Sequence, residues 1–202
     1  MKIKFKTNPN NKKEAVFVLI HSDIRPFLHY DSPKHDRSYR TKAFIVSNRR
    51  DNAKGFIGGT LDKDEDIIDG LKREIDEEYG FDIELEKLIP LCSYESKKIV
   101  SHLFEYHVDE IEFFKILAQI NDNFSNFFNN HTKFLSKYSA DTNIEERSRE
   151  EFGISHFFSE IRNVEAIYLS DRKYDMENLF ENKFVGSGLQ ELKIFLEKYE
   201  LL

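Results

Sequence analysis

The sequence predicts an α/β or α+β protein whose strands form a mixed sheet. Two short, continuous apolar runs, residues 15–20 and 43–47, have the length and composition of buried strands. They precede a segment, residues 65–79, in which apolar residues recur at helical spacing. Strand-like and helix-like segments then alternate as far as a last helix-like segment. This alternation favours one layered core with a mixed sheet.

Length and composition agree with a single globular domain spanning residues 1–202. Hydrophobic residues make up 40% of the 202 residues and aromatic residues 14%, with 19 Phe, so the chain has the means to build a core. The net charge of −7 disfavours sequence-independent binding to nucleic acid. It permits phosphate chemistry where a divalent metal supplies the positive charge.

Cysteine content and hydropathy narrow the class of protein further. The single cysteine, Cys92, excludes an internal disulfide and a zinc cluster built from cysteines. No apolar run reaches about 18 residues, and the basic N-terminal stretch lacks the apolar core of a secretory signal. We therefore expect no membrane association and no secretion, and a cytoplasmic location (nuclear is the alternative in a eukaryote).

The first 50 residues predict three strands and one long loop. Residues 3–5 alternate with lysines, which is typical of an edge strand. Residues 15–20 and 43–47 are the two buried strands. Residues 21–41 show no sustained period, so we expect a long loop there, and loops of this length are usually functional or disordered.

Residues 82–120 predict a strand pair followed by a helix. Residues 82–91 begin with alternating apolar and polar side chains, and residues 99–107 resemble a partner strand. Residues 109–120 carry one apolar stripe at helical spacing. We expect that stripe to be Ile111, Phe114, Leu117 and Ile120.

The remainder of the chain predicts an insertion, a strand and a closing helix. Residues 121–130 are rich in Asn and Phe, and residues 139–151 are charge-dense and poor in apolar residues, which suggests a mobile loop. We expect an insertion at about 121–150, a strand near 164–169 and a helix over 188–202. The apolar face of that helix comprises Leu189, Leu192, Phe195, Leu196 and Tyr199.

The segment that carries chemistry lies between Gly59 and Phe81. A helix is expected to begin near Glu65, because Ile68, Leu71 and Ile75 recur at spacings of three and four residues. Gly80 follows the acidic end of this helix, where a left-handed C′ residue is favoured.

Three carboxylates, Glu74, Glu77 and Glu78, stand at i, i+3 and i+4 on this helix and therefore share one face. They repel one another and lie at the helix end where the macrodipole disfavours negative charge. A hard divalent cation such as Mg²⁺ or Mn²⁺, which takes oxygen ligands, relieves both effects. Arg73 lies two turns after Glu65 and is placed to pair with it.

Gly58 and Gly59 precede the helix and allow the backbone to approach a ligand closely, so that a carbonyl of Gly59 can join the metal ligands. An acidic run alone is more often a solvated helix face. The full spacing is more specific, since seven fixed letters at roughly one in fifteen each occur by chance on the order of 10⁻⁸ per position.

These residues match the pattern GX5EX7REUXEEXGU, with Ile75 and Phe81 in the apolar positions, and the chain resembles the Nudix hydrolases. The resemblance implies an α/β/α sandwich with a mixed sheet and hydrolysis of a nucleoside diphosphate linked to another moiety. It implies that Mg²⁺ or Mn²⁺ is held by Glu74, Glu77 and Glu78 and activates a water molecule.

The resemblance leaves the general base open. Glu74 or a further glutamate outside the pattern would take the proton of the attacking water. A second acidic cluster offers such a residue, although a solvated loop is the simpler interpretation of it. This cluster comprises Glu145, Glu146, Glu150 and Glu151.

Four local motifs are similar to the subgroup that cleaves inosine diphosphate and decaps small nucleolar RNA. They lie at residues 55–59, 69–74, 99–102 and 180–187. Ile57 replaces that subgroup's proline, and its first-strand histidine has no counterpart, which puts hypoxanthine preference in doubt. The substrate-binding residues implied here are Phe56, Arg49, Gly58, Ser187, Glu191 and His102.

Several of these residues have structural alternatives. Phe56 is equally consistent with a core residue, Arg49 with a surface residue and Ser187 with a helix cap. Glu191 falls where the subgroup has a base-reading glutamine. A carboxylate accepts two adjacent hydrogen bonds and so suits guanine, although an exposed Glu on an amphipathic helix is the alternative.

The sequence therefore predicts an enzyme whose substrate is a purine nucleoside diphosphate, another nucleotide-linked molecule or a capped RNA. An ADP-ribose-type pyrophosphatase is a weaker alternative, because Glu95 and Ser96 stand where that class has a proline. The other alternative is a nucleotide-binding or RNA-binding protein with little activity. A homodimer is common in the family and is compatible with the closing helix.

Overall fold

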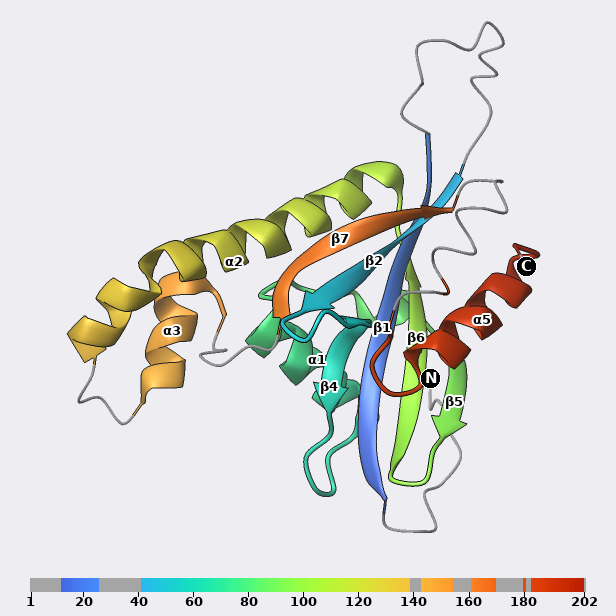
Figure 1. Ribbon diagram of the computed structural model, residues 1–202, viewed down its shortest axis with the longest axis horizontal. Helices are drawn as coiled ribbons and strands as arrows, with labels where there is room; N and C mark the ends of the chain where they lie inside the picture. Colours follow the sequence, from blue (N-terminus) through green and yellow to red (C-terminus); the bar gives the residue numbers. More distant parts are fainter. Residues whose placement is uncertain are drawn as a thin grey trace, which may run out of the picture.

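The computed structural model describes residues 12–25, 41–138, 143–154, 161–169, 180 and 183–201. Within these residues seven strands form one sheet in the order β3-β2-β1-β6-β5, with β4 also paired to β1 and β7 to β2 (Figure 1). The sheet is mixed because β1 and β6 run parallel while the other pairs are antiparallel. The strands are β1 (Lys13–Ile24), β2 (Thr41–Arg49), β3 (Lys54–Gly55), β4 (Ile57–Thr60), β5 (Leu88–Glu95), β6 (Ile99–His107) and β7 (Ile161–Leu169).

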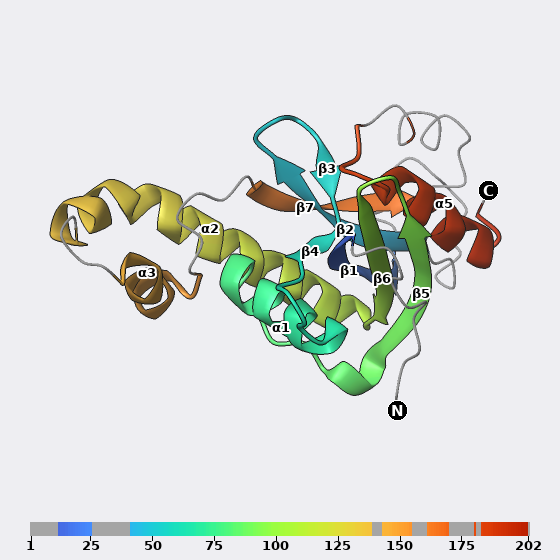
Figure 2. The same cartoon turned by 90° about the horizontal axis from the view of Figure 1, so that it is seen from below.

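Helices cover both faces of this sheet. Figure 2 shows α1 and α2 on one side and α5 on the other. The helices are α1 (Ile67–Glu78), α2 (Glu110–Tyr138), α3 (Ile144–Phe152) and α5 (Gly188–Lys198), with a short 3₁₀ turn, η1, at Leu85–Lys87. The predicted α/β/α sandwich with a mixed sheet is therefore confirmed.

The alternation of β1 explains the two layers. Val16 and Val18 enter the large apolar cluster beneath α1 and α2, whereas Leu19 enters the smaller cluster with Leu192 and Phe195 of α5. Successive side chains of a strand point to opposite faces, so a strand that is buried on both faces reads as a continuous apolar run. This is why residues 15–20 were recognisable as a strand.

The expected loop at 21–41 is wrong at its start, because β1 continues to Ile24 and its last residues pair with β2. His21 and Ser22 are both fully buried, and because their side chains are polar, the apolar pattern of the strand ends before the strand does. Residues 26–40 and the strand expected at 3–5 lie outside the described residues.

The stripe expected on the helix at 109–120 is correct only in part, since Ile120 is fully buried and Phe114 and Leu117 are partly buried against the core. Ile111 is 80% exposed, and Phe113 and Ile116 face the core instead. The helix does not end at residue 120 but continues as α2 to Tyr138, so its buried face is set by a longer series. That series is Phe113, Ile116, Ile120, Phe124, Phe127 and Phe134.

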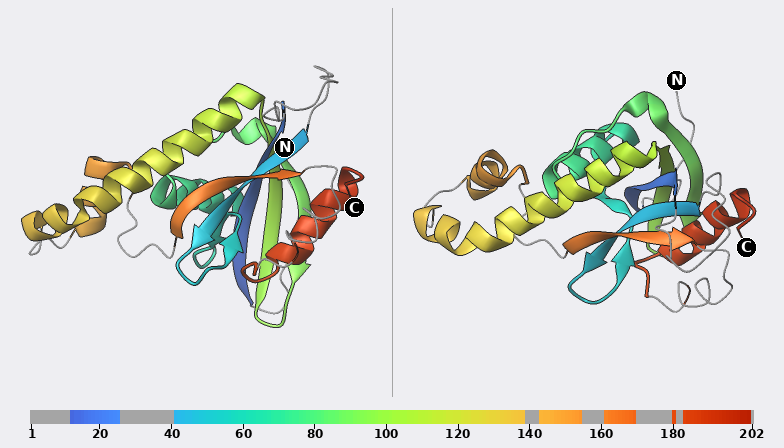
Figure 3. Two further views of the ribbon diagram at one scale, coloured as in Figure 1. Left: turned by 45° about the horizontal axis from the view of Figure 1, so that its top comes forward. Right: turned by 90° about the horizontal axis from the view of Figure 1, so that it is seen from above.

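The segment expected as low-complexity sequence and mobile loop contains further helix. The Asn/Phe-rich stretch is part of α2, where Asn121 hydrogen-bonds the backbone of Val164 in β7 in both directions. Residues 144–152 form α3, and its Phe152 ring packs edge-on against Phe127 and Phe134. Figure 3 shows α3 lying beside the far part of α2, and we call residues 121–138 and 143–154 the α2–α3 arm.

The strand expected at 82–91 is displaced, because residues 85–87 form the turn η1 and β5 begins at Leu88, whereas β6, β7 and most of the closing helix agree with the sequence analysis. β6 has the predicted bounds, β7 contains the predicted 164–169, and α5 buries Leu192, Phe195 and Leu196. In the part of the chain that the structure describes, no helix has the length and apolar character needed to cross a membrane.

Gly80 joins α1 to the arm and offers a test of this packing. Its φ is +66°, and a Cβ there would lie 2.3 Å from the carbonyl oxygen of Gly153. We expect Gly80→Ala to lower the free energy of unfolding by roughly 2–4 kcal/mol, from left-handed strain plus displacement of the arm.

Gly186→Ala is the matched control, because Gly186 has φ +58° and no atom within 4 Å of the added Cβ. This variant should lose only about 1 kcal/mol. Urea unfolding measures both, and equal losses would show that the contact with Gly153 contributes little.

Candidate active site

The acidic helix α1 is defined at both ends by local interactions. Asp66 is its N-cap, and the carboxylate accepts a hydrogen bond of 2.8 Å from the Ile68 N–H. Leu71 and Ile75 are buried beneath it, as their spacing predicts. At the other end the N–H of Gly80 donates to the carbonyl of Ile75 over 2.9 Å, which closes the helix with a left-handed glycine.

The predicted ion pair between Arg73 and Glu65 is present. Nε of Arg73 lies 2.8 Å from Oε1 of Glu65, and Nη2 lies 3.0 Å from Oε2. Nη2 also donates to the carbonyl of Thr60 at 3.1 Å. Hydrogen bonding from Arg73 lowers the pKa of Glu65 and raises that of Arg73 above its ordinary value. Both side chains are therefore charged, and their ion pair ties the loop before α1 to the helix.

Glu74 lies against the glycine pair of β4. Glu74 is 8% exposed, and a Cβ on Gly59 would lie 2.2 Å from Oε2 of Glu74. A side chain at position 59 would force this carboxylate to move from its observed position. Burial raises the pKa of Glu74, although Nη1 of Arg73 lies 3.0 Å from its Oε1 and opposes that change.

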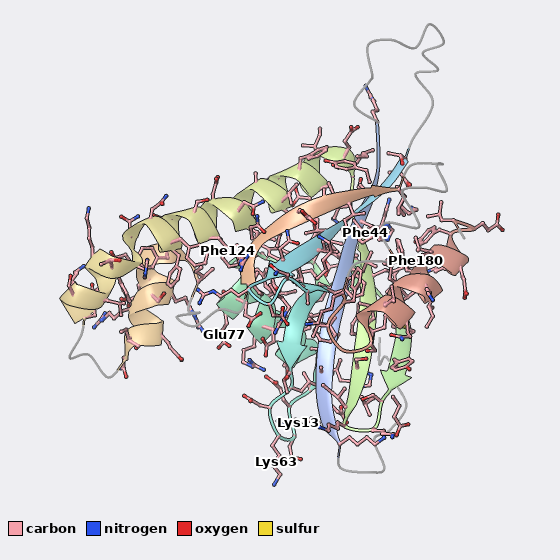
Figure 4. All side chains as sticks on the ribbon, viewed as in Figure 1. Lys13, Phe44, Lys63, Glu77, Phe124 and Phe180 are labelled. Atoms are coloured by element: carbon pink, nitrogen blue, oxygen red, sulfur yellow. The ribbon has the colours of Figure 1, made fainter. Side chains whose placement is uncertain are left out.

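Glu77 and Glu78 complete the acidic face. Glu77 projects from α1 on the side that faces α3 (Figure 4), where its Oε2 is 3.1 Å from Nη1 of Arg73. Burial, and then the negative charge of Glu74, raises the pKa of Glu78 to about 8, and the positive charge of Arg49 at the end of β2 opposes this. Arg49 is thus close enough to the acidic face for its charge to act on Glu78, and its role toward a substrate stays a prediction.

The oxygen donors present suit a hard divalent cation. Burial raises the pKa values of Glu74 and of the partly buried Glu78, and a bound cation would favour their charged forms. Within the described ranges, no three His, Cys, Asp or Glu side chains are already placed to hold a metal. Glu74 and Glu77 instead both accept from Nη1 of Arg73, which would compete with a metal for these two carboxylates.

Two of the predicted substrate residues, Ser187 and Glu191, lie together on the α5 side of the sheet. The Oγ atoms of Ser187 and Ser101 are 2.7 Å apart, and Ser187 donates to Oε1 of Glu191 at 3.0 Å. Ser101 also donates to that oxygen. Glu191 is 1% exposed, which excludes the exposed-residue alternative, and burial raises its pKa. Ser187 occupies the N-cap position of α5 but its side chain makes no capping bond, which contradicts the capping alternative.

Phe56, Gly58 and His102 occupy buried positions. Phe56 is 4% exposed and its ring lies 6.0 Å from that of Phe184 in the α5-side cluster, as expected of a core residue. Gly58 has φ +132°, and a Cβ there would lie 2.2 Å from the carbonyl oxygen of Val16. Their roles toward a substrate stay predictions.

His102 lies in the same transverse row of the sheet as Gly59, because both residues pair with Val16. Its Nδ1 is 2.9 Å from Oγ of Ser93, and its Nε2 is 3.5 Å from a carboxylate oxygen of Glu14. Burial lowers its pKa, which favours the neutral ring.

One residue at the acidic face was missed by the sequence analysis. Arg149 of α3 donates through Nη2 to Oε1 of Glu77 at 3.1 Å, and its Nη1 lies 3.6 Å from a carboxylate oxygen of Asp76. Nothing in a charge-dense segment distinguishes this arginine from its neighbours. In the second acidic cluster, Glu150 pairs with Arg147 and Glu151 with Lys137.

Comparison with known proteins finds no matching family model and no matching curated protein. Solved structures similar to this chain include a mutT/nudix family protein from Listeria innocua, with 14% identity and a TM-score of 0.48 over 97% of this chain and 100% of that one. The ORF135 protein of E. coli has 13% identity and a TM-score of 0.41 over 93% and 90%.

A bifunctional NMN adenylyltransferase/ADP ribose pyrophosphatase from Francisella tularensis has 13% identity and a TM-score of 0.44 over 97% of this chain and 42% of that one. At such identities and TM-scores, the functional assignment of the acidic face depends on this chain's own residues.

The raised pKa of Glu78 predicts a pH-dependent stability of the metal-free protein. The pKa rises from an ordinary 4.5 to about 8 in the folded state, so the folded protein binds this proton more tightly than the unfolded chain. The free energy of unfolding should then fall by about 1–3 kcal/mol as the pH rises from roughly 5 to 8. Urea titrations in a chelator measure this, and Glu78→Gln should abolish that part of the slope.

Asp76→Asn, an exposed change on the same helix, is the control and should leave the slope unchanged. A wild-type slope identical to that of Glu78→Gln would contradict the burial of Glu78.

Proposed function

We propose that this chain is a Nudix-type hydrolase that uses Mg²⁺ or Mn²⁺ to cleave the diphosphate linkage of a nucleoside diphosphate derivative. The observation that carries the proposal is the assembly of the pattern residues into one strand–loop–helix unit. Glu65 and Arg73 form a two-bond ion pair, and Glu74 lies against Gly59 at the start of the acidic face. A merely solvated acidic helix would require neither contact.

Glu74, Glu77 and Glu78, with the carbonyl of Gly59, would hold the metal. When bound, such a metal polarises a phosphoryl oxygen and lowers the pKa of a coordinated water. Arg73 ties the loop to the helix through Glu65 and also bonds Glu74 and Glu77, so it positions the carboxylates that would hold the metal. Glu74 takes the proton of the attacking water, and the α3 glutamates, Glu145, Glu146, Glu150 and Glu151, are the alternatives.

The substrates that we propose are a purine nucleoside diphosphate and a capped RNA. The proposal includes a single domain with an insertion at about 121–150, a cytoplasmic location and a homodimer as the candidate assembly. Phe56, Arg49, Gly58, Ser187, Glu191 and His102 are the proposed substrate residues.

Product analysis tests the activity directly. With Mg²⁺ or Mn²⁺, we expect turnover of at least one member of a panel of inosine, guanosine and adenosine diphosphates, ADP-ribose and a capped RNA. Glu78→Gln should lower kcat by roughly 10²–10⁴-fold, because it removes a charged metal ligand. Asp69→Asn, an exposed change in the first turn of α1, is the control and should keep full activity. No turnover by the folded wild-type protein would favour a binding protein.

Base selectivity tests the proposed role of Glu191. A carboxylate accepts both N–H groups of the guanine edge, so we expect guanosine diphosphate to have a higher kcat/KM than inosine diphosphate. Because Glu191 is bonded to Ser101 and Ser187, base recognition requires these hydroxyls to give up their bonds. A tenfold preference for inosine diphosphate would refute the guanine hypothesis.

A further inference from the structure

We propose that Arg149 of α3 competes with the divalent metal for Glu77, so that the α2–α3 arm sets the metal affinity of the acidic face. This inference rests on the proposed function. It starts from the carboxylate of Glu77, both of whose oxygens accept from a guanidinium. Oε2 lies 3.1 Å from Nη1 of Arg73, and Oε1 lies 3.1 Å from Nη2 of Arg149. A metal that binds Glu77 competes with these donors for the negative charge of the carboxylate.

The two arginines differ in how firmly they are held. Arg73 makes two bonds to Glu65 and one to the carbonyl of Thr60, so its position does not depend on Glu77. Arg149 lies on the surface of α3, its side chain is 45% exposed, and among the residues that the structure describes it forms ion pairs with Glu77 and Asp76. Exposed ion pairs of this kind contribute little stability, so Arg149 is the donor that a metal displaces.

The backbone of Arg149 is nevertheless fixed beside α1. Asn123 of α2 donates to the carbonyls of Tyr79 and Gly80 at the end of α1, at 3.0 and 3.1 Å. Within α3, Ser148 is fully buried and donates to the carbonyl of Ile154 at 2.8 Å. The packing of the α2–α3 arm therefore places the guanidinium of Arg149 close to Glu77, so this contact is a consequence of the fold.

The consequence is electrostatic. A guanidinium at Glu77 neutralises a proposed metal ligand and repels an incoming cation, both of which weaken metal binding. Removal of its charge should therefore tighten the binding of the metal. A purely structural role for Arg149 predicts the reverse, because loss of the contact would loosen the acidic face.

Calorimetric titration with Mn²⁺ alone, without substrate, distinguishes these possibilities. We expect Arg149→Gln to bind Mn²⁺ roughly three- to tenfold more tightly than the wild type. Arg147→Gln is the matched control, since Arg147 lies on the same helix and pairs with Glu150 at 2.8 Å, and it should change the affinity by less than about twofold. In a Glu77→Gln background, Arg149→Gln should tighten Mn²⁺ binding less than it does in the wild type, because only the repulsion between the guanidinium and the cation is then removed.

Unchanged or weaker Mn²⁺ binding by Arg149→Gln, in a protein whose wild type binds Mn²⁺, would overturn the inference and leave the proposed function intact. If neither the wild type nor Arg149→Gln binds Mn²⁺, the proposed function fails and the inference fails with it.

Discussion

The two-bond ion pair between Arg73 and Glu65 is the interaction on which the acidic face depends. It joins the loop that leaves β4 to the second turn of α1, and the bond from Arg73 to the carbonyl of Thr60 extends this link to the strand itself. The same guanidinium reaches Glu74 and Glu77. One side chain thus sets the position of the helix and restrains two carboxylates that would otherwise repel each other.

Carboxylates on the two faces of the sheet have different neighbours. On the α5 side, Glu191 is bonded to two hydroxyls and contributes to the contact between α5 and β6. On the α1 side, Glu78 has a pKa raised to about 8 and lies among other carboxylates. Ionisable residues with strongly shifted pKa values are found most often at functional sites, where a bound ligand supplies the compensating charge. Because burial raises the pKa of Glu191 as well, the assignment of the chemistry to α1 depends on geometry, namely the contacts of Arg73 with Glu65 and of Glu74 with Gly59.

Much of this arrangement was predictable from local sequence. Spacing predicted α1, its terminal Gly80 and the Arg73–Glu65 pair, because each depends on residues within about two helical turns. Runs of apolar residues predicted β1 and β2, since strands buried on both faces read in this way. The end of β1 was not predictable, because His21 and Ser22 are polar yet buried.

The α2–α3 arm escaped prediction for a different reason. Asn residues are poor helix formers, but Asn121 and Asn123 are used to bond backbone groups of β7 and of α1, which only tertiary packing reveals. The contact between Arg149 and Glu77 joins residues 72 positions apart, so no local pattern could indicate it. A mobile loop is expected from the sequence at 139–151, whereas residues 144–152 form α3, and Arg149 of this helix contacts the acidic face.

A crystal soaked with Mn²⁺ and measured for anomalous diffraction tests the central claim most directly. The account predicts a peak within coordination distance of Glu74, Glu77 and Glu78, with Arg73 still paired to Glu65. A peak elsewhere, or retention of both Arg73 and Arg149 on Glu77 with no peak on this helix at saturating Mn²⁺, would contradict it.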